Sequence, residues 1–278
     1  MGYIELNNTG KSYGSREVLR DINLSVEEGE FVAVVGTSAS GKTTLVNIAS
    51  GLIPASTGTV YVGGKPVHDF PDRAAIVFQN YSLLPWLCAL ENVQLAVESA
   101  FPQWGKPKHR EQAVRYLEMV GLGAALSRRP GQLSGGMRQR VAIARAFAVE
   151  PAILFLDEPF GALDALTRAT LQQELARLCE AQQPRATVLM ITNSVDEAIL
   201  LSDRVVTLGR TAGRSGAASL GPAMPVTIPK PRPADLMMHN DEAVRLRGQV
   251  TDSLIGGRVP AAGRVPAQPS LRSIPVGA

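Results

Sequence analysis

Residues 31–43 read FVAVVGTSASGKT, an apolar run that passes directly into a loop of glycine and small polar residues. The run FVAVVG (31–36) is rich in valine and has no polar side chain, which is typical of a strand buried on both faces. The residues that follow, TTLVNIASGL (43–52), have the apolar spacing of a helix. A strand, a loop and a helix in this order open a parallel α/β unit. We therefore predict an α/β fold built around this segment.

The loop itself, GTSASGKT (36–43), fits the pattern G-x-x-x-x-G-K-[ST]. Backbone N–H groups in such a loop point at phosphate oxygens, and the following helix adds its positive end. Lys42 is expected to reach the β and γ phosphates of a nucleotide, and the Thr43 hydroxyl to join the shell of a Mg²⁺ ion. A chance glycine-rich turn is the alternative, but chance matches rarely fall between a buried strand and a helix. The residues expected to line the nucleotide here are Gly36, Thr37, Ser38, Ala39, Ser40, Gly41, Lys42, Thr43 and Thr44.

Two acids follow a second apolar strand in AILFLDEP (152–159). This strand delivers Asp157 and Glu158 at its C-terminal end, where open α/β sheets bind ligands. Adjacent residues on an extended chain point in different directions, so the two acids should differ in role. One can hold Mg²⁺ through water, and the other can orient or deprotonate the attacking water. Two solvated loop acids are the alternative, which the phosphate loop upstream disfavours.

The segment LSGGMRQR (133–140) predicts a second anion-binding helix start, because a serine and two glycines precede a helical pattern. A chain with one nucleotide loop has no obvious need for two such sites. The arrangement makes sense if the second site grips the γ-phosphate of ATP held by a different subunit. A plain helix N-cap is the alternative.

These motifs, in this order, resemble the ATP-binding subunit of ABC transporters over roughly residues 1–210. The motifs are the phosphate loop at 36–43, Gln79 after a strand, LSGGMRQ at 133–139, the acids at 157–158 and GALD at 161–164. The resemblance implies a P-loop ABC ATPase with a RecA-like core, an N-terminal antiparallel β-subdomain and a helical subdomain at about 85–145. It also implies a head-to-tail dimer with two ATP molecules at its interface.

The resemblance also implies a role for single residues. Tyr13 of KSYG would stack on adenine, unless it is a packed turn aromatic. Gln79 would approach Mg²⁺ and relay the nucleotide state to membrane subunits, unless it is simply a polar strand end. With Thr43, Asp157 would hold Mg²⁺, in its case through water, and Glu158 would be the general base.

Two further groups of residues would act between subunits. Asp164 would communicate across the dimer, unless it only caps the next helix. The signature residues expected to act on the neighbouring subunit's ATP are Leu133, Ser134, Gly135, Gly136 and Gln139.

This chain departs from the family pattern at two positions. Ala39 replaces the usual glycine of the phosphate loop, and a Cβ there costs roughly 1–2 kcal/mol if the backbone needs a positive φ. Asn193 of ITNS stands where family members usually have the histidine of ITHD. Asparagine keeps a donor amide but is uncharged and cannot act as an acid or base. Either the amide is a working switch, or the site containing Asn193 turns over slowly beside a second, histidine-containing ATPase chain.

Composition sets the outer limits. The chain has 278 residues, 45% of them hydrophobic and 19% charged, which is ordinary for a soluble globular protein. Its apolar stretches fall short of a membrane helix, and no basic-then-apolar leader precedes them. The two cysteines, Cys88 and Cys179, lack metal or redox spacing. We expect an ATP-binding domain at 1–210, a C-terminal extension at 211–255 containing a helix at 241–255, and a disordered tail at 256–278.

The transported solute is suggested by resemblance alone. QNYSLLPWLCALENV (79–93) resembles ATPases of nitrate, taurine, alkanesulfonate and bicarbonate importers, and the extension resembles nitrate-transport ATPases. We therefore expect import of a small anion, nitrate first (or nitrite or cyanate), with a taurine, alkanesulfonate or bicarbonate importer as the alternative. A nucleic-acid or ribosome ATPase would carry tandem domains or long insertions, and neither is present. A weakly hydrolysing regulatory subunit is the third possibility.

The expected partners follow from this assignment. They are integral membrane permease subunits, a second ATPase subunit and, indirectly, a periplasmic solute-binding protein, with no nucleic acid. The expected cofactors are ATP and Mg²⁺. The expected location is peripheral, on the cytoplasmic face of the inner membrane.

Overall fold

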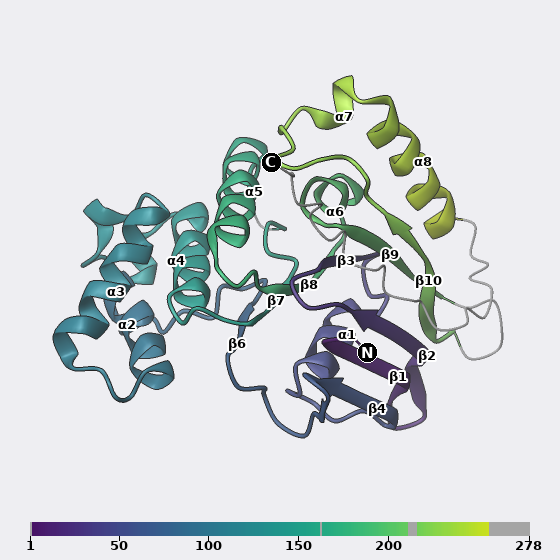
Figure 1. Cartoon of the computed structure of the whole chain (residues 1–278), viewed down its shortest axis with the longest axis horizontal. Coiled ribbons are helices and arrows are strands. Elements are labelled where there is room, and N and C mark those ends of the chain that lie inside the picture. Colours follow the sequence, from purple (N-terminus) through teal and green to yellow (C-terminus); the bar gives the residue numbers. More distant parts are fainter. Residues whose placement is uncertain (1, 162, 211–215, 256–278) are drawn as a thin grey trace, which may run out of the picture.

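The computed structural model describes residues 2–161, 163–210 and 216–255. The expected tail at 256–278 lies outside the described residues. Ten strands form one sheet in the order β5-β4-β1-β2-β10-β9-β3-β8-β7-β6. The helices lie on both faces of its parallel half and in a separate group at one side (Figure 1).

The parallel half of the sheet is built from the apolar runs of the sequence. Its strands are β3 (Phe31–Gly36), β6 (Ala74–Val77), β7 (Ile153–Asp157), β8 (Thr187–Thr192) and β9 (Arg204–Arg210). Alternate residues of β3 enter two different hydrophobic clusters, Val32 and Val34 on one face and Ala33 and Val35 on the other. The strand is therefore buried on both faces, as the continuously apolar sequence FVAVVG predicts.

Three helices cover this half of the sheet. Helix α1 (Lys42–Ala49) packs in the cluster of Val32 and Val34, whereas α5 (Ala165–Ala181) and α6 (Val195–Leu201) pack in the other. The helix predicted after the phosphate loop is therefore confirmed. The C-terminal ends of β3, β7 and β8, which are neighbours in the sheet, all meet at the edge where α1 begins.

The N-terminal strands form an antiparallel extension of the sheet. They are β1 (Ile4–Tyr13), β2 (Arg16–Val26), β4 (Thr57–Val62) and the short β5 (Lys65–Pro66). The strand β10 (Ala218–Pro225) lies between this part and the parallel half, antiparallel to β9 and paired with β2 at Ala218–Leu19. The sequence analysis predicted only a helix in the extension, so this strand is an addition to it.

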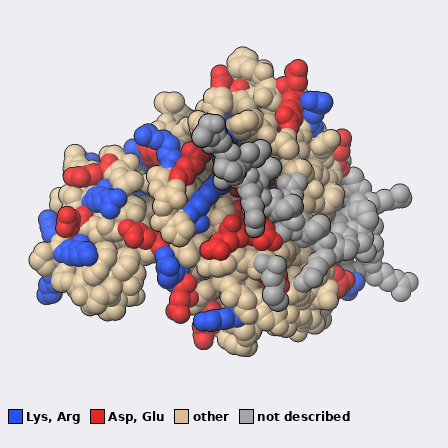
Figure 2. Space-filling model, viewed as in Figure 1, with Lys and Arg blue, Asp and Glu red and all other residues tan. Residues whose placement is uncertain are grey.

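A group of helices stands apart from the sheet (Figure 1). It consists of α2 (Ala89–Ala100), α3 (Lys106–Met119) and α4 (Gly135–Phe147), with short 3-10 turns at Gly123–Ala125 and Pro130–Gln132. On the face seen in Figure 2, basic and acidic side chains are interspersed over these helices. Such mixing is typical of a solvated protein surface.

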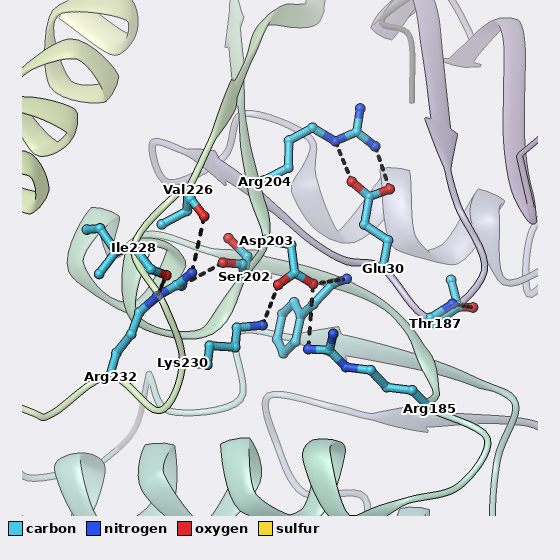
Figure 3. A network of polar contacts seen from close by, with 12 residues as sticks. Glu30, Arg185, Thr187, Ser202, Asp203, Arg204, Val226, Ile228, Lys230 and Arg232 are labelled. Atoms are coloured by element: carbon cyan, nitrogen blue, oxygen red, sulfur yellow. Dashed lines mark hydrogen bonds and ion pairs between the residues drawn. The ribbon is translucent and has the colours of Figure 1, made fainter. Parts of the chain in front are cut away.

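The C-terminal extension continues past β10 into α7 (Leu236–His239) and α8 (Asp241–Ile255), so the helix predicted at 241–255 is confirmed. Arg232 ties the extension to the core and is only 5% exposed. Its guanidinium donates to the carbonyl of Ile199 at 2.6 Å, near the C-terminal end of α6. It also donates to the carbonyl of Ser202 at 2.7 Å, directly after that helix (Figure 3). It also donates to carbonyls of the extension itself, at Ile228 and Val226.

A carboxylate beside Arg232 completes this anchor. Asp203 accepts from the Phe31 amide at 2.9 Å and from Lys230 at 2.6 Å, and Arg185 lies 3.6 Å from it (Figure 3). Nearby, Arg204 donates to Glu30 at 2.7 and 2.8 Å. The extension is therefore held to the end of α6 by the buried hydrogen bonds of Arg232 and, through Lys230 and the part-buried Asp203, to β3.

Replacing Arg232 by lysine is expected to lower the free energy of unfolding by about 2 kcal/mol or more. Lysine keeps the charge but cannot reach all the carbonyls, and each buried acceptor left without a donor costs about 1–3 kcal/mol. Chemical denaturation measures the loss. Arg245→Lys is the control, because Arg245 is an exposed arginine on α8. Equal stability of the two variants would show that Arg232 does not anchor the extension.

Candidate functional site

The phosphate loop connects β3 to α1 and depends on two unusual backbone positions. Gly41 has φ 97° and Ala39 has φ 60°, so the condition under which Ala39 costs stability is met. Gly36 must be glycine, because a Cβ there would lie 2.8 Å from the Leu208 carbonyl oxygen. Thr37, Ser38 and Ala39 are exposed, and Ser40 is buried beneath them. The loop thus presents its backbone to solvent at the N-terminus of α1, as an anion site requires.

Lys42 is the centre of the polar contacts around the loop. Its side chain is 4% exposed, and its ammonium donates to the carbonyls of Gly36 and Thr37, both at 3.0 Å. It also donates to Asn193 Oδ1 at 2.5 Å and lies 3.2 Å from Glu158 Oε1. Asn193 follows β8 and Glu158 follows β7, so the fold brings these sequence-distant residues to Lys42.

The two acids after β7 do point in different directions. Asp157 accepts from the Thr43 hydroxyl at 3.2 Å. Glu158 turns instead toward Lys42 and accepts from Gln79 Nε2 at 3.2 Å. Its backbone is left-handed, with φ 44°, and its amide donates to the Ile191 carbonyl at 2.9 Å. Backbone strain of this kind persists only where the surroundings hold it, and it often marks functional residues.

The environment of Asp157 disfavours its charge. Burial raises the pKa of Asp157 and the nearby Glu158 raises it further, whereas the Thr43 hydrogen bond and Lys42 lower it. An oxygen-rich pair formed by a buried carboxylate and the Thr43 hydroxyl suits Mg²⁺, which proteins hold with one or two carboxylates and the substrate's phosphates. Thr43 and Asp157 therefore fit the expected metal, whereas the Gln79 side chain contacts Glu158.

Asp157→Asn is expected to raise the melting temperature of the nucleotide-free protein, because the substitution removes a buried charge. The folded-state pKa is raised, so the charged carboxylate costs stability above that pKa. This cost vanishes as the pH falls below the ordinary pKa of aspartate. The gain should therefore be full at neutral pH and shrink at acidic pH, which thermal melts at both can measure.

Asp252→Asn, on the exposed face of α8, is the control for this variant. A gain from Asp157→Asn that did not change with pH would contradict a buried charge as its cause.

The residues of the signature segment (133–139) differ in how far the fold exposes them. Ser134 is exposed and caps α4, accepting from the Met137 amide at 3.2 Å. Gly135 and Gly136 are half-buried, and a Cβ on Gly136 would meet Thr167 Cγ2 at 2.5 Å. The side chains of Leu133 and Gln139 are buried, and neither amide atom of Gln139 has a hydrogen-bond partner within the described chain. Only the serine and the glycines are thus presented at the surface in this structure.

Tyr13 and Asp164 lie outside the contacts of Lys42. Tyr13 is 51% exposed at the end of β1, with the Lys11 ammonium 5.3 Å from its ring centre. Asp164 accepts from the Thr167 amide at 3.0 Å and so caps α5; this hydrogen bond lowers its pKa. Asp164 therefore does cap α5. Because its side chain is also exposed, capping is compatible with a role at a subunit boundary.

Sequence analysis missed the support of the segment after Gln79. Arg145 of α4 donates to the carbonyls of Ser82 at 2.7 Å and Tyr81 at 2.9 Å, and both of those residues have positive φ. Burial lowers the pKa of Arg145. The sequence showed a cation on a helix but gave no signal of its acceptors. This clamp joins the Gln79 loop to the helical group.

The comparisons with known proteins agree with the motifs. Residues 19–161 match the protein family described as ABC transporter. The nitrate import ATP-binding protein NrtD of Synechococcus elongatus is 44% identical over 258 residues, covering 91% of this chain and 92% of that protein. The bicarbonate transport ATP-binding protein CmpD of Synechocystis sp. is 45% identical over 257 residues, covering 91% and 89%.

A solved structure extends the match to three dimensions. The dimeric post-hydrolysis state of the ATP-binding cassette MJ0796, bound to ADP and Pi, is 32% identical, with a TM-score of 0.68, and the match covers 81% of this chain and 99% of that one. This confirms the predicted fold class. Within the described residues, no helix is both long and apolar enough to cross a membrane. The chain belongs to the ABC transporter family, as an ATP-binding subunit that hydrolyses ATP.

Proposed function

We propose that this chain drives import of a small inorganic anion, with nitrate as the favoured substrate. The observation that carries the proposal is similarity along 91% of the chain, extension included, to the nitrate ATPase NrtD. The second candidate is bicarbonate, since the bicarbonate protein CmpD is equally similar at 45% identity. The ATPase does not touch the solute, so neither candidate rests on the chemistry of the site.

The residues around Lys42 are proposed to bind ATP and Mg²⁺. Lys42 would exchange its contacts with loop carbonyls and Asn193 for phosphate oxygens, and Tyr13 would stack on adenine. Thr43, Asp157 and Gln79 would hold Mg²⁺, which neutralises charge on the phosphates when bound. Ser134, Gly135 and Gly136 would contact the ATP of the neighbouring subunit.

Glu158 is proposed to be the general base. It sits between Lys42 and Gln79, and its strained backbone fixes the carboxylate at the edge of the sheet. The carboxylate would take a proton from the attacking water as the γ-phosphoryl group departs in line. Asn193, held 2.5 Å from Lys42, would contact the γ-phosphate.

A groove beside the Gln79 strand is proposed to receive a permease subunit. Its volume is about 720 Å³, and it lies between β6, α2 and the end of α4. The groove is lined on one side by Ala74 and Ile76 of β6, the strand that leads to Gln79, and Arg145 lines it too. A segment docked there would touch both the Gln79 strand and its clamp. With a permease docked there, the ATPase chain would lie peripherally on the cytoplasmic face of the inner membrane. A periplasmic solute-binding protein would deliver the anion to the permease from the opposite side.

Asn193 supports a pair of unequal ATPase subunits. Its amide oxygen faces Lys42, and the residue provides neither the charge nor the proton transfer of a histidine. We propose that this site turns over slowly and that a second ATPase chain with histidine supplies the faster site.

Asn193→His is accordingly expected to raise ATP turnover of the assembled transporter several-fold. A charge-assisted hydrogen bond is worth about 1.5–3 kcal/mol, and if all of it lowered the barrier the rate would rise roughly tenfold or more. A several-fold gain requires only part of that energy. ATPase activity and uptake should be measured side by side. No gain, or a loss, would show that asparagine is already a working switch.

The import proposal is tested by deleting the gene and measuring uptake of labelled nitrate and bicarbonate. Nitrate uptake and growth on nitrate as sole nitrogen source should fail, and the wild-type gene but not Lys42→Ala should restore both. A selective defect in bicarbonate uptake would favour the second candidate. Normal uptake of both anions would overturn the proposal.

A further inference from the structure

Glu197 is a buried carboxylate for which the proposed mechanism has no use. It lies in the first turn of α6 and is 5% exposed. Its Oε2 accepts from the Thr192 hydroxyl at 2.6 Å. The same hydroxyl accepts from the Ser194 amide at 3.0 Å, and the Ser194 hydroxyl accepts from the Glu197 amide at 3.2 Å. These bonds close a ring around the backbone on both sides of Asn193, so the position of Glu197 sets the position of Asn193.

The other carboxylate oxygen of Glu197 faces a different loop. Its Oε1 lies 3.8 Å from Arg168 Nε on α5, and Arg168 Nη2 donates to the Leu163 carbonyl at 3.0 Å. Leu163 immediately precedes Asp164, and the Arg168 amide also donates to the Asp164 carbonyl at 2.9 Å. Arg168 is therefore bound to the segment proposed to face the neighbouring subunit.

The contact between Glu197 and Arg168 is incomplete. At 3.8 Å it is an ion pair without a hydrogen bond, and Arg168 Nε has no acceptor although it is shielded from solvent. A shift of about 1 Å would turn it into a charge-assisted hydrogen bond. The C-terminal end of α6 is held by Arg232, which donates to the carbonyls of Ile199 and Ser202; Figure 3 shows the Ser202 contact. The helix is thus anchored at the end opposite Glu197.

A purely stabilising role explains this arrangement poorly. Burial raises the pKa of Glu197, which means that its charge costs stability where it lies. Buried ion pairs give little net stability even at good geometry. An arginine 3.8 Å away offsets less of the cost of burying the Glu197 charge than an arginine in hydrogen-bond contact would.

We propose that Glu197 and Arg168 are positioning residues that couple Asn193 to Asp164. Movement of Asn193 at the γ-phosphate of one ATP would pass through the Thr192–Glu197 bond to Arg168. Arg168 would then shift Leu163 and Asp164 at the boundary with the second ATPase subunit. The inference rests on the proposed roles of Asn193 and Asp164, and it gives the dimer a route by which one site senses the other.

The test measures coupling of Asn193 and Asp164 in the assembled transporter. ATP turnover is determined for Asn193→Ala, Asp164→Ala and the double variant, first in the wild-type background and then with Glu197→Gln. Glutamine keeps an acceptor for Thr192 but loses the charge that faces Arg168. In the wild-type background the double variant should depart from the product of the single losses by about fivefold or more. With Glu197→Gln the losses should simply multiply.

Glu174→Gln is the matched control. Glu174 lies on α5, is partly shielded from solvent and pairs with Arg140 at 3.0 Å, and within the described residues it has no hydrogen bond or ion pair with the loops of Asn193 or Asp164. This variant should leave the coupling intact. Arg168→Gln should abolish it as Glu197→Gln does, which serves as a second route if Glu197→Gln folds poorly by thermal melt.

The outcomes separate the two proposals. Absence of coupling in the wild-type background, or coupling that survives Glu197→Gln and Arg168→Gln, would overturn the inference alone. A wild-type transporter that does not hydrolyse ATP would instead overturn the function on which the inference rests.

Discussion

Glu158→Gln is expected to reduce ATP turnover at the site that Glu158 serves by about 10²–10⁴-fold, the usual contribution of a general base, while leaving ATP binding intact. Glutamine has the same shape and can still accept a hydrogen bond from Gln79, so the loop around it should not collapse. What is lost is the ability to take a proton from water. With binding preserved and hydrolysis blocked, ATP should trap the closed dimer, which size-exclusion chromatography or crosslinking would detect.

The control for this variant is again Glu174→Gln, since Glu174 is a partly shielded glutamate paired with an arginine. It should turn over normally and form no trapped dimer. Normal turnover at the Glu158 site in the Glu158→Gln complex would remove Glu158 as the base and point to another group that orients the water.

Lys42→Ala should abolish ATP-dependent transport by preventing tight ATP binding. The Lys42 ammonium contacts the Gly36 carbonyl, Asn193 and Glu158. A charge-assisted hydrogen bond from it to phosphate is worth about 1.5–3 kcal/mol, or roughly 10–150-fold in affinity. Binding of a fluorescent ATP analogue should weaken by at least this factor.

Lys65→Ala, on the exposed strand β5, should bind the analogue like the wild type. The contrast with Glu158→Gln is diagnostic, because one variant should lose binding and the other only hydrolysis. Unchanged affinity in Lys42→Ala would mean that the loop backbone alone holds the phosphates.

The sheet could be predicted because its strands carry their signal locally. FVAVVG is buried on both faces and therefore continuously apolar, and β3 coincides with that run. The different orientations of Asp157 and Glu158 were also predictable, since neighbours on an extended chain diverge. Local chemistry of this kind needs no partner to be recognised.

Features that depend on distant partners were not predictable. Nothing in ITNS shows that the Asn193 amide accepts from Lys42, because that contact exists only when β3 and β8 pair. The same holds for Arg145, whose acceptors lie in a loop with positive φ values. The burial of Gln139, predicted to face a neighbouring subunit, depends on how α4 packs.

The place of β10 also has a consequence for the order in which the protein is made. β2 ends at Val26, whereas the strand that sits beside it in the sheet begins at Ala218. A ribosome releases the N-terminal strands first, so β2 waits with an open edge while nearly all of the cassette is synthesised. An early-terminated chain that ends before β10 would keep that edge and tend to pair with other nascent chains. The last strand thus closes the sheet late, and only a nearly complete chain can bury the edge of β2.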